Sequence, residues 1–306
     1  MKLFYFRFPN GISNFGDNIN PWIWEQLLPG VFDQDKTTTF VGIGSLLNEY
    51  IPKAQKTVVF GSGVGYGKSL PKIDESWKIY CLRGQLSAKA LGVGSELVVT
   101  DSAVLVRRLY KQANTKVNRF AYIPHIDNAI LGDMDWKLIC EQAGIAYIDP
   151  RWPIEQVLSA IMQTEVLLAE AMHGAIVADA LRVPWIPIFT TTRVFPFKWH
   201  DWCSSIDIEC QPRYVMPDKK LYPPGPGVRS RLRHSINCAK QAPVRFLKTF
   251  WEDKYNKIAI QLADIAKTSK PTLSQEYRIE QLTVELEERL EQFKQDVASG
   301  YFHHFV

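Results

Sequence analysis

The sequence lacks any hydrophobic run long enough to cross a membrane as a helix. Hydrophobic residues make up 46% of the 306 residues, but polar and charged residues interrupt every run before it reaches about 20 residues. The first residues, MKLFYFRFP, are broken by Arg7 and Pro9, so they do not form the apolar core of a secretory signal peptide. We therefore expect a soluble, cytoplasmic protein.

Cysteine is scarce, and neither sign of charge dominates. The five cysteines are odd in number and no two have CxxC spacing, which argues against a disulfide framework and against a structural zinc site. We interpret them as buried, unreactive thiols. The net charge of +4 is too small to indicate a nucleic acid partner.

Positive charge is nevertheless concentrated in one segment. Between Arg213 and Lys248, nine basic residues stand against a single acid, Asp218. Such a segment favours anionic partners, either a membrane surface or a diphosphate-bearing substrate. The alternative is an ordinary solvated basic face. The same region contains five prolines within Pro212–Gly227 and is expected to be an extended loop.

The first part of the chain has the pattern of an α/β domain. Short apolar runs end in Gly-rich or polar turns, which is typical of buried parallel strands. We expect strands at Lys2–Phe8, Thr39–Ile43, Thr57–Phe60, Lys78–Leu82 and Leu97–Thr100. We expect helices at Asn20–Leu28, with Pro21 in its first turn, and at Gln85–Leu91, closed by Gly92.

A second alternation follows the polar segment Tyr110–Arg119, which is the expected linker. Strands are expected at Phe120–Ile123, Ala146–Ile148, Val166–Ala169 and Trp185–Phe189, and helices at Ile154–Met162 and Gly174–Leu181. Alternating strands and helices imply right-handed βαβ units and parallel sheets. The sequence thus predicts an α/β fold with two Rossmann-like lobes facing a cleft, residues 1–112 and 118–211.

The remaining residues, 212–306, are expected to form the Pro-rich basic loop and two C-terminal helices. The helices are predicted at Pro243–Lys267 and Leu273–Ser299. The second has an apolar stripe at helical spacing, formed by Leu282, Leu286, Leu290, Phe293 and Val297. This stripe is expected to pack against the body, with a dimer contact as the alternative.

Polar clusters follow several predicted strands, where ligands bind in open α/β sheets. The first contains Gly16, Asp17 and Asn18, and its glycine-containing loop at a helix start can offer backbone N–H groups to an anion. Capping of the helix by Asp17 or Asn18 is the alternative. The second is the run Gly61–Lys68, which includes Gly63 and permits close approach of the backbone, but it matches neither a P-loop nor GxGxxG.

The third and fourth clusters supply a cation and a carboxylate. Arg83 stands with Ser87 at a predicted helix start and can hold carboxylate or phosphate oxygens through two parallel bonds. A buried structural arginine is the alternative. Asp101 follows a predicted strand, where it can orient a donor or act as a base, or simply cap a helix.

The fifth cluster, Glu170–Ala175, carries the strongest candidate for chemistry. His173 and Gly174 stand between a predicted central strand and a helix. Histidine exchanges protons near neutral pH, and a helix N-terminus favours its neutral, basic form. The position at the cleft end of a central strand favours a catalytic role over a structural one.

The order of these motifs resembles the polysaccharide pyruvyltransferase family. The resemblance runs from Lys2 to about Ile208 and rests on a GD turn, a GSG run, an RG..S segment, a strand-ending Asp and a final HG. The stretch Phe197–Ser205 is similar to a branch acting in bacterial exopolysaccharide synthesis. The resemblance implies a two-lobed fold like one major class of glycosyltransferases (GT-B), phosphoenolpyruvate as donor, no metal or cofactor, and a pyruvate ketal on a sugar as product.

Two departures from the family pattern concern the site. Many members have an arginine two residues before the histidine, where this chain has Ala171, and prolines around the aspartate, where it has Thr100 and Ser102. If that arginine holds the donor, either one of three cations, Arg83, Arg193 or Lys198, replaces it here, or donor binding is altered.

Phosphoenolpyruvate is doubly anionic, so its site is expected to use those cations and backbone N–H groups near Gly16 or Gly174. His173 is predicted to be the acid/base, and Asp101 to assist or orient it. The acceptor is expected to be a lipid-linked oligosaccharide or another saccharide at the inner membrane face, where the basic segment gives peripheral contact.

Two other functions remain open from sequence. A nucleotide-sugar glycosyltransferase of the same architecture needs an acidic ribose contact, for which Glu209 is the nearby candidate. A non-catalytic protein that binds glycans or anions is the other, because Ala171 departs from the family pattern.

Overall fold

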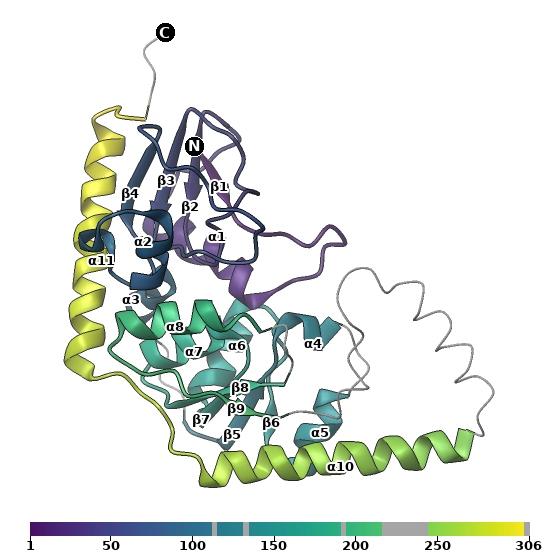
Figure 1. Ribbon diagram of the computed structural model, residues 1–306. Helices are drawn as coiled ribbons and strands as arrows, with labels where there is room; N and C mark the ends of the chain where they lie inside the picture. Colours follow the sequence, from purple (N-terminus) through teal and green to yellow (C-terminus); the bar gives the residue numbers. More distant parts are fainter. Residues whose placement is uncertain (112–114, 131–134, 191–193, 216–243, 303–306) are drawn as a thin grey trace.

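The computed structural model describes residues 1–111, 115–130, 135–190, 194–215 and 244–302 (Figure 1). Within these ranges the chain is a mixed α/β protein with two parallel sheets and C-terminal helices, which confirms the predicted fold class at that level. No helix in these ranges is long and apolar enough to span a membrane.

The first sheet has four parallel strands in the order of the sequence. They are β1 (Lys2–Phe4), β2 (Thr38–Val41), β3 (Lys56–Phe60) and β4 (Trp77–Cys81). A helix, α1 (Phe15–Leu27), connects only β1 to β2. The connections from β2 to β3 and from β3 to β4 are helix-free, against the expected alternation, and these long loops are therefore available to line a site at the carboxyl edge.

Helix α1 begins earlier than predicted. The prediction placed Pro21 in the first turn, but the helix starts at Phe15 and Pro21 lies inside it. Proline provides no N–H for the carbonyl four residues back, and here Asn20 Nδ2 donates to the Asp17 carbonyl at 3.2 Å instead. The local hydrogen bond compensates for the missing donor, which explains how the helix continues through the proline.

The predicted strand Leu97–Thr100 was wrong. The segment is a short 3-10 helix, η1 (Ser95–Leu97), followed by a single bridge between Leu82 and Val98. The chain then turns into a second 3-10 helix, η2 (Ser102–Leu105), because Asp101 caps it by accepting the Ala103 N–H at 3.0 Å. Helix α3 (Val106–Leu109) continues from it. By contrast, α2 (Gln85–Leu91) has the predicted bounds, and Gly92 closes it with φ 67°.

The second sheet is also parallel throughout. Its order is β6 (Ala146–Tyr147), β5 (Asn118–Ile123), β7 (Thr164–Ala169), β8 (Trp185–Phe189) and β9 (Arg213–Tyr214). Strand β5 begins inside the expected linker, and β9 was not predicted. The helices are α4 (Ile126–Ile130), α5 (Trp136–Ala143), α6 (Ile154–Met162), α7 (Met172–Ala180) and α8 (Pro196–Ser205). Of these, α4, α5 and α8 were not predicted.

One apolar core extends between the two sheets. It includes Trp24 and Phe60 from the first part of the chain and Ala175 and Ile176 from the second, all fully buried. Helix α1 packs on α6 and α7, and α7 also packs on η2. The starts of α1 and α7 are therefore held together by the core beneath them.

The C-terminal helices lie close to their predicted bounds. Helix α10 (Val244–Thr268) packs on α5, and α11 (Glu276–Ala298) runs along the first sheet (Figure 1). Phe293 contacts the rings of Phe40 and Tyr80, each at 5.3 Å between centroids. Packing of the apolar stripe against the body is thereby confirmed. Most of the Pro-rich loop and of the basic segment, residues 216–243, lies outside the described residues, as do Arg193 and Cys238. The four cysteines that the structure describes are buried and form no disulfide with one another.

Candidate active site

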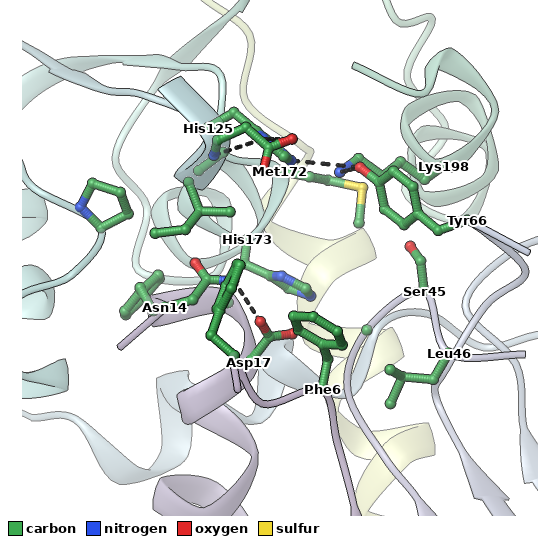
Figure 2. Close-up of a pocket in the computed structure, with 18 of the residues that line it drawn as sticks. Phe6, Asn14, Asp17, Ser45, Leu46, Tyr66, His125, Met172, His173 and Lys198 are labelled. Carbon is green, nitrogen blue, oxygen red and sulfur yellow. Dashed lines mark hydrogen bonds and ion pairs between the residues drawn. The ribbon is translucent and has the colours of Figure 1, made fainter. Parts of the chain in front are cut away.

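A cavity of about 360 Å³ opens where the two sheets meet (Figure 2). From the first sheet it is lined by residues after β1 and in the loops after β2 and β3; from the second, by residues after β5 and β7 and at the start of α8. Its polar lining includes Asn14, Asp17, Ser45, Asn48, Tyr66, His125, Asp127, His173 and Lys198, and its apolar lining includes Phe4, Phe6, Phe8, Leu46 and Met172.

Two helices begin at the cavity. Gly16 lies in the first turn of α1, and Met172 and His173 lie in the first turn of α7; all three line the cavity. In the described part of the chain, their backbone N–H groups donate to no carbonyl. Unpaired N–H groups and the helix dipole both favour negative charge at such a position, so this wall can bind an anion.

His173 and Asp101 form a pair behind that wall. His173 Nε2 lies 3.6 Å from Asp101 Oδ2, and Asp101 is fully buried. Within the described ranges neither of these two atoms has a hydrogen-bond partner, although the other carboxylate oxygen accepts the Ala103 N–H. Unpaired polar atoms are costly in a protein interior, and catalytic hydrogen bonds are often long before substrate binds. The separation of His173 Nε2 and Asp101 Oδ2 is only slightly longer than a hydrogen bond, so a small shift would let Asp101 stabilise a positive charge on His173.

Two predicted glycines make room for this histidine and its helix. A Cβ on Gly16 would lie 2.5 Å from His173 Nδ1, so only glycine permits the imidazole to pack there. A Cβ on Gly174 would lie 2.8 Å from Ile123 Cγ2 at the end of β5. Both glycines therefore serve close packing, and Gly16 also lines the cavity.

Asp17 faces the same cavity as a buried carboxyl. Burial raises its pKa, against the lowering effects of the hydrogen bond from Asn14 Nδ2 and of the nearby His173 and Lys198. Neither Asp17 nor Asn18 caps α1, whose N-cap is Asn14. Asn18 is not part of the cavity wall; its Nδ2 donates to Ser13 Oγ at 2.7 Å.

Lys198, Tyr66 and His125 form a second polar group in the cavity (Figure 2). Lys198 is buried, and its Nζ donates to Tyr66 Oη at 2.5 Å. Tyr66 Oη lies 3.5 Å from His125 Nε2. Burial, assisted by the charge of Lys198, lowers the pKa of His125 to about 3, so this imidazole is neutral at physiological pH. Among the described residues, no carboxylate lies within 4.0 Å of Lys198 Nζ.

Arg83 and Ser87 lie outside the cavity. Arg83 is fully buried, pairs with Asp201 at 2.9 Å and donates to Ser45 Oγ at 2.7 Å. Ser87 Oγ donates to the same Asp201 at 2.6 Å. A Cβ on Gly63 would lie 2.3 Å from Arg83 Cζ, so that glycine accommodates the guanidinium. Arg83 reaches the cavity wall indirectly, through Ser45 Oγ and the Gly44 carbonyl, since both of these residues line the cavity.

Glu170 is an organising residue that the sequence analysis did not single out. Its fully buried carboxylate accepts hydrogen bonds from the Tyr122 hydroxyl, the His125 N–H and Asn128 Nδ2, and from the Thr190 N–H and hydroxyl, at 2.5–3.0 Å. It thereby holds the end of β5, the start of α4 and the end of β8 together. Only the position of Glu170 directly after a strand signalled this role.

Two comparisons with known proteins bear on the family of this chain. Residues 14–189 match the family described as polysaccharide pyruvyl transferase. The chain is also 42% identical over 219 residues, 70% of this chain and 68% of the other, to the succinoglycan biosynthesis protein ExoV of Rhizobium meliloti (strain 1021). The chain belongs to the polysaccharide pyruvyl transferase family.

Of the two departures expected from the family pattern, one lies at the cavity and the other is buried behind it. Ala171, where many members were expected to have arginine, lines the cavity together with Lys198. Thr100 and Ser102, which flank Asp101 in place of prolines, are buried and bonded to Ser205 Oγ and the Phe60 carbonyl. Arg193, the third cation predicted to replace the missing arginine, lies outside the described residues. Among those described, no three His, Cys, Asp or Glu side chains gather as a metal site requires.

Proposed function

We propose that this pyruvyl transferase moves the pyruvyl group of phosphoenolpyruvate onto a sugar of an exopolysaccharide precursor and leaves it as a cyclic ketal. Family membership and the similarity to a succinoglycan biosynthesis protein support the reaction class. The observation that carries the proposal is the pair of His173 and buried Asp101 at a cavity with two helix N-termini and one buried lysine.

The donor is held as an anion in this proposal. Phosphoenolpyruvate has a phosphate and a carboxylate, and the cavity offers the N–H groups of Gly16, Met172 and His173 together with Lys198. A buried ammonium without a carboxylate partner favours an anionic ligand. Lys198 shares the cavity with Ala171, so it is well placed to replace the family's arginine. Arg83 supports Ser45 in this proposal, and Arg193 is kept as a further donor contact.

The chemistry requires a proton to move to carbon. The first sugar hydroxyl adds to C2 of the donor while C3 gains a proton and becomes a methyl group; the second hydroxyl then replaces phosphate at C2. His173 takes the hydroxyl proton and delivers a proton to C3, a role that typically contributes about 10²–10⁴-fold in rate. Asp101 stabilises the imidazolium that forms in between, and Asp17 lies on the same wall.

The proposal extends to the domain organisation and to the acceptor. We assign residues 1–112 and 118–211 to two Rossmann-like lobes of GT-B type, and residues 212–306 to the basic loop and C-terminal helices. The acceptor is then a saccharide, in our proposal lipid-linked, that reaches the enzyme from the cytoplasmic side, with the basic loop against the inner membrane face.

Replacement of His173 by alanine tests the proposal. The parent is expected to release phosphate from phosphoenolpyruvate with a saccharide acceptor, and mass analysis of the product should show a ketal. His173→Ala should lower that rate by about 10²–10⁴-fold, while His200→Ala, an exposed histidine on α8, should retain it. Near-normal ketal formation by His173→Ala would rule out His173 as the acid/base.

The same assay separates the rival functions. Labelled sugar nucleotides are supplied in parallel with labelled phosphoenolpyruvate. Transfer from the sugar nucleotide would identify a glycosyltransferase, and binding of phosphoenolpyruvate without phosphate release would identify a non-catalytic binding protein.

A further inference from the structure

The group formed by Lys198, Tyr66 and His125 is separate from the His173–Asp101 pair but faces the same cavity (Figure 2). Neither His125 nor Tyr66 is needed by the chemistry assigned to His173. The contacts of the Tyr66 hydroxyl nevertheless suit a group that gives up its proton during the reaction better than a group that only supports the fold.

The phenol oxygen of Tyr66 faces two donors. Lys198 Nζ donates to it at 2.5 Å. The backbone N–H of Asp127 donates to His125 Nδ1 at 3.3 Å, which leaves the proton of the neutral ring on Nε2, the atom that faces Tyr66 Oη. With its oxygen approached by an ammonium and an imidazole N–H, the phenol must direct its own proton elsewhere. Donors aimed at this oxygen also stabilise the negative charge that it acquires when the proton leaves.

The backbone at Tyr66 supports a functional reason for this placement. Its φ is 51°, in the left-handed region that a bulky residue rarely adopts. The neighbouring loop holds it there: Asn48 Nδ2 donates to the Gly65 carbonyl at 2.9 Å, and the Glu49 carboxylate accepts the N–H groups of Lys68 and Ser69. Strain that the surroundings maintain is characteristic of functional sites.

Ketal formation needs a second proton donor at its second stage. Two hydroxyl protons leave the sugar, one for the methyl group and one for the departing phosphate. In the proposed function, His173 carries out the first proton transfer, from the sugar hydroxyl to C3. The second requires a donor to the phosphate oxygen and an acceptor for the second hydroxyl, and one phenol can perform both in turn.

We infer that Tyr66 is a second catalytic residue of the site, the general acid for loss of phosphate. Its O–H proton passes to the phosphate oxygen as the C2–O bond breaks. The second sugar hydroxyl forms its bond to C2, and its proton returns to the phenolate. Lys198 and His125 are positioning residues that hold the phenol oxygen and stabilise its charge. This inference rests on the proposed function.

Tyr66→Phe tests the inference in a single-turnover experiment with phosphoenolpyruvate and acceptor. The variant is expected to release phosphate about 10²-fold more slowly. An adduct of acceptor and donor that still contains phosphate should accumulate and be detected by its mass after rapid quenching. The KM for phosphoenolpyruvate should stay within a few fold of the parent value. Tyr277→Phe removes an exposed hydroxyl on α11 and serves as control.

The outcomes separate the two proposals. Phosphate release by Tyr66→Phe at the parent rate, or a defect confined to the KM for phosphoenolpyruvate, would overturn the role of Tyr66 and leave the pyruvyl transfer intact. A parent enzyme that forms no ketal with any acceptor would overturn both. In contrast to Tyr66→Phe, His173→Ala should accumulate no adduct, because the addition itself is blocked.

Discussion

Two buried carboxylates of this protein differ in one respect. Glu170 and Asp101 are both fully buried, and each follows a strand or bridge at the carboxyl edge of a sheet. Glu170 accepts five hydrogen bonds through its two oxygens. Asp101 accepts one from the part of the chain that the structure describes, and its second oxygen faces His173 Nε2 at 3.6 Å with no hydrogen-bond partner there.

The difference is the one expected between a carboxylate that stabilises the fold and a carboxylate that takes part in a reaction. A buried charge is tolerated when hydrogen bonds satisfy it, and the satisfied network then fixes its surroundings. In the proposed mechanism, the unsatisfied Asp101 oxygen instead stabilises the positive charge on His173 when that side chain gains a proton. We therefore expect changes at Glu170 to alter stability and changes at Asp101 to alter rate.

The largest expected effect is on stability, from Glu170→Ala. The change leaves several buried donors without an acceptor, each worth about 1–3 kcal/mol, so the free energy of unfolding should fall by at least about 3 kcal/mol. Chemical denaturation measures it. Glu165→Ala changes an exposed residue on β7, the strand that precedes Glu170, and is the control that should change stability little. A loss of activity at unchanged stability would contradict the supporting role of Glu170.

The complementary change is Asp101→Asn, which keeps an oxygen for the Ala103 N–H. The amide cannot stabilise an imidazolium, so phosphate release should slow by about 10²-fold. The free energy of unfolding should change by less than about 1 kcal/mol, as measured by denaturation of the same preparation. An inactive variant that is also strongly destabilised would mean that Asp101, like Glu170, mainly supports the fold.

The smallest effect concerns His125, whose backbone N–H belongs to the Glu170 network while its ring lines the cavity. Its pKa is lowered to about 3 in the folded protein, against about 6.5 when unfolded. The unfolded chain therefore binds the proton first as pH falls, and stability is lost between these two values. At pH 5 the loss from this group is about 2 kcal/mol.

His125→Gln removes that group and its titration. The difference in unfolding free energy between pH 7.5 and pH 5 should be smaller in His125→Gln than in the parent, in denaturation curves recorded at both values. His200→Ala, at an exposed histidine, should keep the parent's pH dependence. An identical pH dependence in His125→Gln would show that His125 is not held neutral by burial.

Sequence predicted the regular elements well where the pattern is local. Strand β8 and helices α2 and α6 have the predicted bounds, because continuous apolar runs and a C-terminal glycine are local signals. The strand at Leu97–Thr100 failed because the Asp101 cap starts a new helix there. Helix α1 was shortened in prediction because the hydrogen bond by which Asn20 compensates for Pro21 cannot be read from spacing.

The residues of the candidate site likewise fall into those that the sequence predicted correctly to lie near one another and those that it misplaced or missed. His173, Asp101, Gly16 and Asp17 were predicted because each follows a predicted strand, and the structure places them around one cavity or directly behind it. Arg83 has the same sequence context, but its guanidinium forms a buried ion pair with Asp201 and does not line the cavity. Tyr66 and His125 were missed, since the first stands in a glycine run and the second precedes an unpredicted helix.

The sequence alone determined the α/β class and the family, because apolar periodicity and the order of motifs are local properties of the chain; it also made His173 the leading candidate for chemistry. Only the tertiary structure decided which charged groups remain unsatisfied. Arg83 and Asp201 are 118 residues apart and neutralise each other, whereas Lys198 reaches a tyrosine 132 residues away and no carboxylate among the described residues. Burial and long-range pairing set these outcomes, and neither is a property of any local stretch of sequence.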